Sequence, residues 1–169
     1  MELRALRATP RDVLLFFKWA HDPTIRSNSV HQDPMTLGRF NKWFSKVLFS
    51  KKNCLLIIEG RNENLVWVPV GQVRFNQYGE IGVSLSNAFR GRHLATQAIQ
   101  TGVEYLHRHS PLRLISAHIK QDNRVSTRAF EMAGFQFAGD TRVGGHACQR
   151  YVYHQPSNLH VNINLHVVN

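Results

Sequence analysis

The stretch EIGVSLSNAFRGRHLAT, residues 80–96, decides the fold that we expect for this chain. Residues 80–86 have the pattern of a strand, and a basic, glycine-containing turn leads from them into a helix. A strand-to-helix turn presents free backbone N–H groups at the positive end of the helix dipole. Arg90 and Arg92 add positive charge at the same place. The stretch therefore predicts a site for a phosphate-bearing ligand.

The composition indicates one globular domain. The chain has 169 residues, of which 43% are hydrophobic and 19% are charged, which is enough apolar mass for a sizeable core. The formal net charge of +10 is spread over both halves of the chain. Such a charge suits a protein that handles polyanionic small molecules, and it equally suits a basic solubilising surface. No lysine-rich run with interleaved aromatic residues is present, so nucleic acid is not an expected partner.

Cysteine usage and hydropathy favour a cytoplasmic protein. Cys54 and Cys148 lie far apart in apolar segments, so we expect neither a disulfide framework nor a metal site. The N-terminus alternates charged with apolar residues and lacks the apolar region of a signal peptide. No apolar run approaches membrane-spanning length, so no membrane partner is expected.

Periodicity and turn residues predict an α/β chain of the α+β type. Strands are expected near residues 3–8, 53–59, 65–75, 80–86, 112–119, 135–139 and 149–154. Helices are expected over about 10–21, 37–48, 91–109 and 123–133, and the polar residues 24–35 suggest a loop. The sheet is then mostly antiparallel, with one helix-crossed parallel step from 80–86 to 112–119 and four flanking helices. A ligand belongs where that strand pair splays apart.

The last residues form a tail beyond a predicted domain of residues 1–154. Apolar and polar side chains alternate strictly from Leu159 onward, which predicts an extra, half-buried strand within residues 155–169. Such a strand needs an edge to pair with. It would extend the chain's own sheet or join a second subunit in a homodimer, and the pattern leaves both arrangements open.

Three motifs follow one another in the chain. They are Glu80-Ile81-Gly82 at the start of the central strand, then Arg90-Gly91-Arg92-His93-Leu94-Ala95, and then Asn123-x-x-Ser126 followed by Phe130 and Gly134-Phe135. In this order they resemble the GNAT superfamily of acyl-CoA-dependent N-acetyltransferases, whose pyrophosphate loop has the pattern R/Q-x-x-G-x-G/A. His93 departs from that pattern, which has glycine at its position. The resemblance runs from about residue 3 to residue 154 and implies the GNAT fold with acetyl-CoA as co-substrate.

The same resemblance implies which residues hold acetyl-CoA. The pantetheine arm would pair with the backbone of the central strand, where Val83 and Leu85 lie. Asn123 would bond a pantetheine amide. The remaining cofactor-binding residues would be Arg90, Gly91, Arg92, His93, Leu94, Ala95, Thr96, Ser126 and Phe130.

A closer resemblance points to a substrate. The segments Trp19-x-x-Asp22-Pro23-x-x-Arg26-x-x-Ser29, Trp43-Phe44 and Gly71-Gln72-Val73-Arg74-Phe75 are similar to N-acetyltransferases of the pseudaminic acid pathway, although Phe40 replaces an expected histidine. Those enzymes acetylate the 4-amino group of a UDP-linked amino-deoxy sugar, which implies a nucleotide sugar as the small-molecule amine substrate. The acceptor would meet Arg26, Asn28, Trp43, Gln72 and Arg74.

Two other functions remain open. Ribosomal-protein N-terminal acetyltransferases share the Glu80-Ile81-Gly82 start and the same order of motifs, so a protein N-terminus is the alternative acceptor. A non-catalytic acyl-CoA binding module is the third reading, because His93 stands in the loop and Phe130 stands where many relatives carry a tyrosine acid.

Three residues are candidates for the general base that deprotonates the amine, namely Glu80, Ser84 and His118. A carboxylate at the start of the central strand can act through a water. Imidazole side chains in general exchange protons near neutral pH. Each candidate also has a purely structural reading, and the sequence does not choose among them. Because Phe130 has no proton to give, the leaving thiolate would take one from water, Tyr151 or Tyr153, or leave unprotonated.

Overall fold

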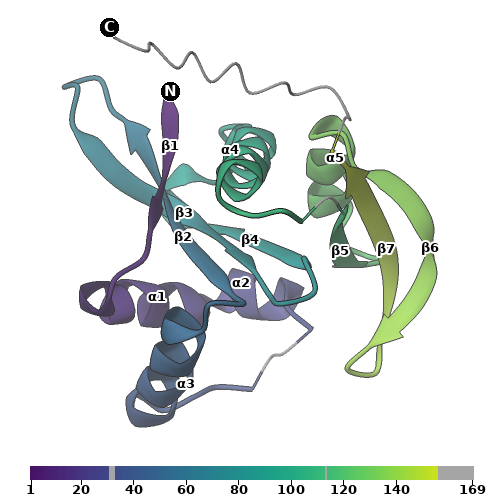
Figure 1. Ribbon diagram of the computed structural model, residues 1–169, viewed down its shortest axis with the longest axis horizontal. Helices are drawn as coiled ribbons and strands as arrows, with labels where there is room; N and C mark the ends of the chain where they lie inside the picture. Colours follow the sequence, from purple (N-terminus) through teal and green to yellow (C-terminus); the bar gives the residue numbers. More distant parts are fainter. Residues whose placement is uncertain (31–32, 113, 156–169) are drawn as a thin grey trace, which may run out of the picture.

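The computed structural model describes residues 1–30, 33–112 and 114–155. Its strands form two sheets with the orders β1-β2-β3-β4 and β5-β7-β6 (Figure 1). The strands are β1 Leu3–Arg7, β2 Cys54–Arg61, β3 Trp67–Phe75, β4 Ile81–Leu85, β5 Leu114–Lys120, β6 Gln136–Val143 and β7 His146–His154. The α-helices are α1 Val13–Ala20, α2 Pro23–Asn28, α3 Leu37–Phe49, α4 Leu94–His109 and α5 Arg124–Met132, with short 3-10 helices at Pro10–Asp12 and Asn87–Phe89.

Helices cover both faces of the four-stranded sheet. Helix α4 lies on one face, and α1, α2 and α3 lie on the other (Figure 1). Alternation along β2 supplies both cores, because Leu56 and Ile58 pack toward α4 while Leu55 and Ile57 pack toward α1 and α3. The three-stranded sheet carries α5 and joins the α4 side of the core through β5.

The two sheets meet at one point. Glu80, just before β4, forms a single parallel bridge with Ser116 of β5, and the Ser116 N–H donates to the Gly79 carbonyl at 3.1 Å. Beyond this bridge β4 and β5 belong to separate sheets, joined along the chain by α4. The expected α+β class, the mostly antiparallel pairing and the splayed parallel strand pair are therefore confirmed.

Local sequence signals placed many element ends to within about two residues. The last two strands are longer than predicted, because β6 runs on to Val143 and β7 begins at His146. The Thr9 hydroxyl and N–H both donate to the Asp12 carboxylate, at 2.8 and 2.7 Å, and fix the start of the first helical segment. The register of β2 against β3 shifts beside Pro69 and Gly71, as a bulge does. Gly134, at φ +96°, ends α5 as the αL residue that we expected.

The structure corrects two expectations about the helices. Within residues 24–35, which we expected to form a loop, Pro23–Asn28 is a fifth α-helix, because the Asp22 carboxylate caps it by accepting from the N–H groups of Thr24 and Ile25. We had read Asp22-Pro23 as the end of one helix, and it also starts the next. Helix α4 begins at Leu94 rather than at Gly91, because His93 before it is left-handed at φ +57°.

The C-terminal tail and the membrane question complete the comparison of the fold with the sequence. The predicted C-terminal strand, and the homodimer that it suggested, depend on residues 156–169, which lie outside the described residues. Among the helices that the structure describes, none is both long enough and apolar enough to cross a membrane.

Close packing of α4 on β3 depends on Gly102. A Cβ atom there would lie 2.6 Å from Cγ1 of Val73, which is fully buried and cannot move aside. We expect Gly102→Ala to lower the free energy of unfolding by about 1–3 kcal/mol in urea denaturation. The control is Gly38→Ala in α3, where a Cβ would meet nothing within 4 Å and should stabilise by up to about 1 kcal/mol. Equal effects at the two positions would contradict this packing argument.

Candidate active site

The gap between β4 and β5 is lined by backbone polar groups of β4. The Asn76 N–H donates to the Glu80 carbonyl at 3.1 Å, so the even-numbered residues of this antiparallel pair bond to β3. The odd-numbered residues Val83 and Leu85 therefore direct their N–H and C=O groups into the gap. The Leu85 carbonyl accepts from Nε of Arg90 at 3.1 Å. The backbone of Val83 and the Leu85 N–H are left facing the gap, ready for an extended ligand arm.

The turn after β4 has features that favour an anion. Within the described part of the chain, no backbone N–H group of residues 91–96 has a hydrogen-bond partner. Gly91 is at φ +70°, and a Cβ there would meet nothing within 4 Å, so its surroundings are open. The exposed residues Gly91, Arg92 and His93 lead directly into α4, whose dipole adds positive potential. These observations fit the binding of a pyrophosphate.

A pair of ionisable side chains lies at the closed end of the gap, where β4 and β5 still touch. Nδ1 of His118, on β5, lies 2.8 Å from Oε1 of Glu80. Nδ2 of Asn76 donates to the other carboxylate oxygen, Oε2, at 3.1 Å. When Nδ1 carries the proton that Glu80 accepts, Nε2 of His118 is the basic nitrogen. Among the described residues Nε2 has no hydrogen-bond partner.

Residues of β3 and β4 continue this face. The register pairs Gln72 with Ser84 and Arg74 with Gly82, on the side of the sheet away from α4. Nε2 of Gln72 donates to the Ser84 hydroxyl at 3.2 Å. The exposed Arg74 side chain lies across Gly82, where a Cβ would approach Nε to 2.7 Å.

The guanidinium of Arg74 is a cation held by no anion. Within the described residues it has no hydrogen bond and no ion pair. The Glu80 carboxylate is the neighbouring charge, and it favours the protonated guanidinium. An arginine stays charged at every physiological pH. The face away from α4 thus offers a free positive group beside the Glu80–His118 pair.

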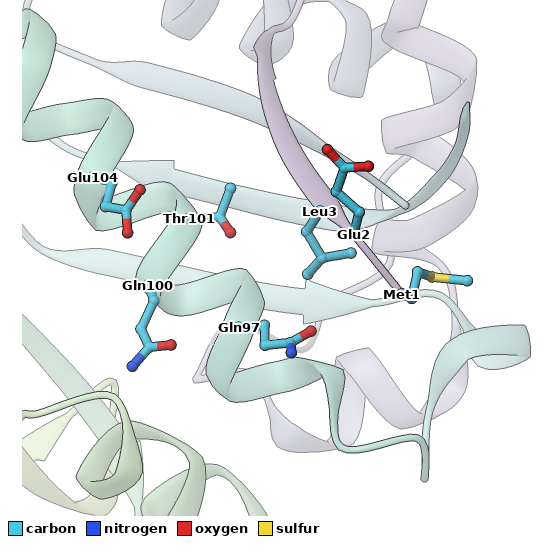
Figure 2. A pocket seen from close by; sticks show the side chains of 7 residues that line it. All are labelled: Met1, Glu2, Leu3, Gln97, Gln100, Thr101 and Glu104. Atoms are coloured by element: carbon cyan, nitrogen blue, oxygen red, sulfur yellow. The ribbon is translucent and has the colours of Figure 1, made fainter. Parts of the chain in front are cut away.

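A separate groove lies between the start of β1 and α4, and Figure 2 shows its lining. It has a volume of about 250 Å³. Its two carboxylates already pair with exposed arginines, Glu2 with Arg61 and Glu104 with Arg108. It is lined by Met1, Glu2, Leu3, Gln97, Gln100, Thr101 and Glu104, none of which we expected in the site.

Comparison with known proteins identifies the family. Residues 1–136 match the family model described as "Acetyltransferase (GNAT) domain". The chain belongs to this family. A search of curated proteins finds no match.

Solved structures of GNAT acetyltransferases have the same fold. The spermidine N-acetyltransferase from Vibrio cholerae, in complex with CoA and spermine, aligns at TM-score 0.78 with 14% identity, over 90% of this chain and 95% of that one. An aminoglycoside acetyltransferase in complex with coenzyme A aligns at 0.72 with 17% identity, over 91% and 95%. RimL, a ribosomal L7/L12 α-N-protein acetyltransferase in complex with CoA, aligns at 0.73 with 16% identity, over 90% and 93%. At these identities the likeness establishes the GNAT fold alone.

In this GNAT chain the structure gives Arg90 a protein partner. Its Nη2 lies 2.7 Å from Oδ1 of Asp22, besides the bond from Nε to the Leu85 carbonyl. We had expected Arg90 and Arg92 to act together as charges for the pyrophosphate. Arg92 is exposed and lies over the Phe89 ring at 5.4 Å, so it is the arginine of the loop whose charge remains available.

Other residues expected at the co-substrate take structural positions. The Thr96 hydroxyl donates to the Ala129 carbonyl at 3.4 Å and ties α4 to α5. The Asn123 side chain accepts from the Ser126 N–H and caps α5, so its NH₂ group is the part left for a ligand. Phe130 is 4% exposed and packs edge-to-face on Phe135, as a core residue does. Leu94 is buried and Ala95 half-buried at the start of α4.

The residues expected at the acceptor lie on three elements, β3, α2 and α3. Gln72 and Arg74 line the face that carries the Glu80–His118 pair. Arg26 is half-buried and Asn28 exposed on α2. Trp43 lies apart from them, half-buried on α3, with its ring 5.3 Å from Phe40 in the aromatic core of α1 and α3.

Sequence reasoning missed Asn76, Asp22 and Lys120. Asn76 stands four residues before Glu80 in a turn, and its Oδ1 also accepts from the Glu80 N–H, a local pattern that turn chemistry suggests. Asp22 was quoted in the Trp19-x-x-Asp22-Pro23 segment but was given no partner or role of its own. Lys120 is 8% exposed at the end of an apolar strand, and nothing in the sequence distinguished it from a surface lysine.

The left-handed backbone at His93 explains why the loop pattern has glycine there. Histidine tolerates this conformation better than most residues, whereas a β-branched side chain does not. We expect His93→Val to cost about 1–2 kcal/mol of unfolding free energy in urea denaturation. His93→Gly should stay within about 1 kcal/mol of the natural chain. Equal stability of the valine and glycine variants would contradict the strained position of His93.

Proposed function

We propose that this GNAT acetyltransferase transfers the acetyl group of acetyl-CoA directly to the amine of an anionic acceptor, the 4-amino group of a UDP-linked amino-deoxy sugar, in a ternary complex in the cytoplasm. The observation that carries the choice of acceptor is the unpaired guanidinium of Arg74 beside the Glu80–His118 pair. A diphosphate offers oxygen pairs that a guanidinium binds as a fork. A polycationic acceptor would instead be repelled by this charge.

The residues of the gap fit the co-substrate. The unpaired N–H groups of residues 91–96 are placed to take the pyrophosphate, and the gap-facing backbone of Val83 and Leu85 is placed to pair with the pantetheine arm. Acetyl-CoA supplies an activated thioester when it is bound. A backbone N–H of Val83 or Leu85 is then the donor available to a tetrahedral oxyanion.

Among the three candidate bases, the hydrogen bonds favour His118. Both oxygens of Glu80 are already engaged, by His118 and by Asn76. The Ser84 hydroxyl is held by Gln72. Nε2 of His118 is the remaining basic atom, and Glu80 orients the ring by accepting from Nδ1. We therefore assign proton removal from the amine to His118 and the positioning of its imidazole to Glu80.

The proton for the leaving thiolate does not come from Tyr151. Burial raises the pKa of Tyr151, and the nearby Glu131 carboxylate raises it further. The Tyr151 hydroxyl donates to Oε1 of Glu131 at 3.1 Å, so its proton is already directed to a carboxylate. Phe130 has none to give. The thiolate therefore leaves unprotonated or takes a proton from water or Tyr153.

A thiol-release assay with acetyl-CoA tests the acceptor. We expect turnover of a UDP-linked 4-amino sugar and far slower turnover of spermidine, an aminoglycoside and a basic peptide with a free N-terminus. Faster turnover of the peptide would replace the nucleotide sugar with the alternative function. Tight CoA binding with no turnover of any amine would leave only a CoA-binding module.

Replacement of Arg74 tests how the acceptor is held. We expect Arg74→Gln to raise the KM for the nucleotide sugar about tenfold or more, since a charge-assisted hydrogen bond is worth about 1.5–3 kcal/mol. The KM for acetyl-CoA should stay the same. Arg108→Gln on the exposed face of α4 removes an equal charge elsewhere and is the matched control. An unchanged acceptor KM in Arg74→Gln would exclude this residue from the acceptor site.

The two members of the Glu80–His118 pair should respond differently to replacement. We expect His118→Ala to lower kcat about 10²- to 10⁴-fold and added imidazole to restore part of it. Glu80→Gln should lower kcat less and should not respond to imidazole, because the ring is still present. A His118→Ala variant with the natural kcat would remove His118 as the base.

A further inference from the structure

Helix α2 is tied to the end of β4 through Asp22. Oδ1 of Asp22 caps the helix and lies 2.7 Å from Nη2 of Arg90, whose Nε donates to the Leu85 carbonyl. Burial alone would raise the pKa of the Asp22 carboxyl, but the hydrogen bond and charge of Arg90 outweigh it, together with the N–H groups of Ile25 and Thr24. The pKa is therefore lowered, and the ion pair is intact at neutral pH.

The other end of α2 is tied to β5. Lys120, the last residue of β5, donates from Nζ to the Ser27 carbonyl at 2.8 Å. By alternation Lys120 lies on the same face of β5 as His118, two residues away. The chain just after α2 passes near the β6–β7 turn, since a Cβ added at Gly144 would come within 3.3 Å of the Val30 carbonyl.

The burial of the Lys120 ammonium group is not expected to stabilise the fold. Among the described residues Lys120 is the one buried charged side chain. Within those residues no carboxylate forms an ion pair with it. An ammonium group buried against one carbonyl loses much of its hydration. A methionine of similar length would fill the same space without that loss.

The contacts Asp22–Arg90 and Ser27–Lys120, called the two ties below, hold α2 across the open end of the gap. Arg90 follows β4 and Lys120 ends β5, so the ties come from the two strands that diverge. Helix α2 lies on the face away from α4 (Figure 1). The Glu80–His118 pair is on the same face, because Glu80 alternates with Ile81, which packs in the core on the α4 side. A helix of six residues has little stability of its own, so its position depends on such tertiary contacts.

We propose that α2 is a wall of the acceptor pocket that Arg90 and Lys120 hold across the β4–β5 gap, and that these two cations are positioning residues for the acceptor. The proposal rests on the proposed function in that it takes the face away from α4 as the acceptor side. It gives Arg90 a different role from the phosphate contact that the loop pattern implies. It also explains the buried ammonium of Lys120 as the group that holds the C-terminal end of α2.

Hydrogen exchange of the full chain tests the ties without any acceptor. We expect Lys120→Met and Arg90→Gln each to speed amide exchange in residues 23–30 by tenfold or more, with exchange in α4 and β7 unchanged. Lys120→Arg, which keeps the cation, should restore the slow exchange. Lys42→Met on the exposed face of α3 is the control for loss of a lysine. Unchanged exchange in residues 23–30 for both variants would overturn the proposal.

Binding and kinetics then separate this proposal from the proposed function. We expect both variants to raise the KM of whichever acceptor is turned over by about tenfold, with the Kd of CoA by calorimetry within twofold of the natural value. Lys120→Met should keep or increase resistance to urea, which a merely structural lysine would not do. A tenfold weaker Kd for CoA in Arg90→Gln would return Arg90 to the phosphate site and overturn its positioning role. Suppose that amide exchange in residues 23–30 is faster in both variants but the enzyme acetylates a different amine. That result would support the role of α2 as a pocket wall and would reject only the nucleotide sugar as acceptor.

Discussion

The whole arrangement depends on the parallel pairing of β4 and β5 stopping after one bridge, between Glu80 and Ser116. Had the two strands stayed paired, their backbone groups would have satisfied one another and left no place for a ligand. The early divergence instead leaves Val83 and Leu85 facing an open edge. Backbone polar groups are satisfied by something in almost every folded protein. At this edge that role is open to a bound amide-rich arm.

Divergence also determines what each side of the gap can do. On one side the chain turns into α4, and a run of unpaired N–H groups meets the helix dipole. On the other, the point where the strands still touch brings Glu80 and His118 together from positions 38 residues apart. The backbone N–H groups of the turn and the Glu80–His118 pair therefore lie at opposite ends of one short strand. That separation matches a co-substrate whose phosphates and reactive thioester lie at opposite ends.

Charge on the acceptor face narrows the chemistry further. Two of the cations beside the gap are neutralised or buried, since Arg90 pairs with Asp22 and Lys120 bonds Ser27. Within the described residues Arg74 has no hydrogen bond or ion pair, and its charged neighbour is the carboxylate of Glu80. An acceptor that carries both an amine and an anionic group has complementary partners there. A spermidine N-acetyltransferase, an aminoglycoside acetyltransferase and a ribosomal-protein acetyltransferase have the same fold, so the fold leaves the choice of acceptor to the side chains.

The sequence by itself determined what local rules govern. Apolar periodicity and turn residues predicted most elements and the splayed strand pair, because these signals depend on residues close together in the chain. Only the tertiary structure decided the partners of the large side chains that carry a polar or charged group. Arg90 went to Asp22, Lys120 to Ser27 and Trp43 to the aromatic core, since such a side chain takes whatever group the fold brings within reach.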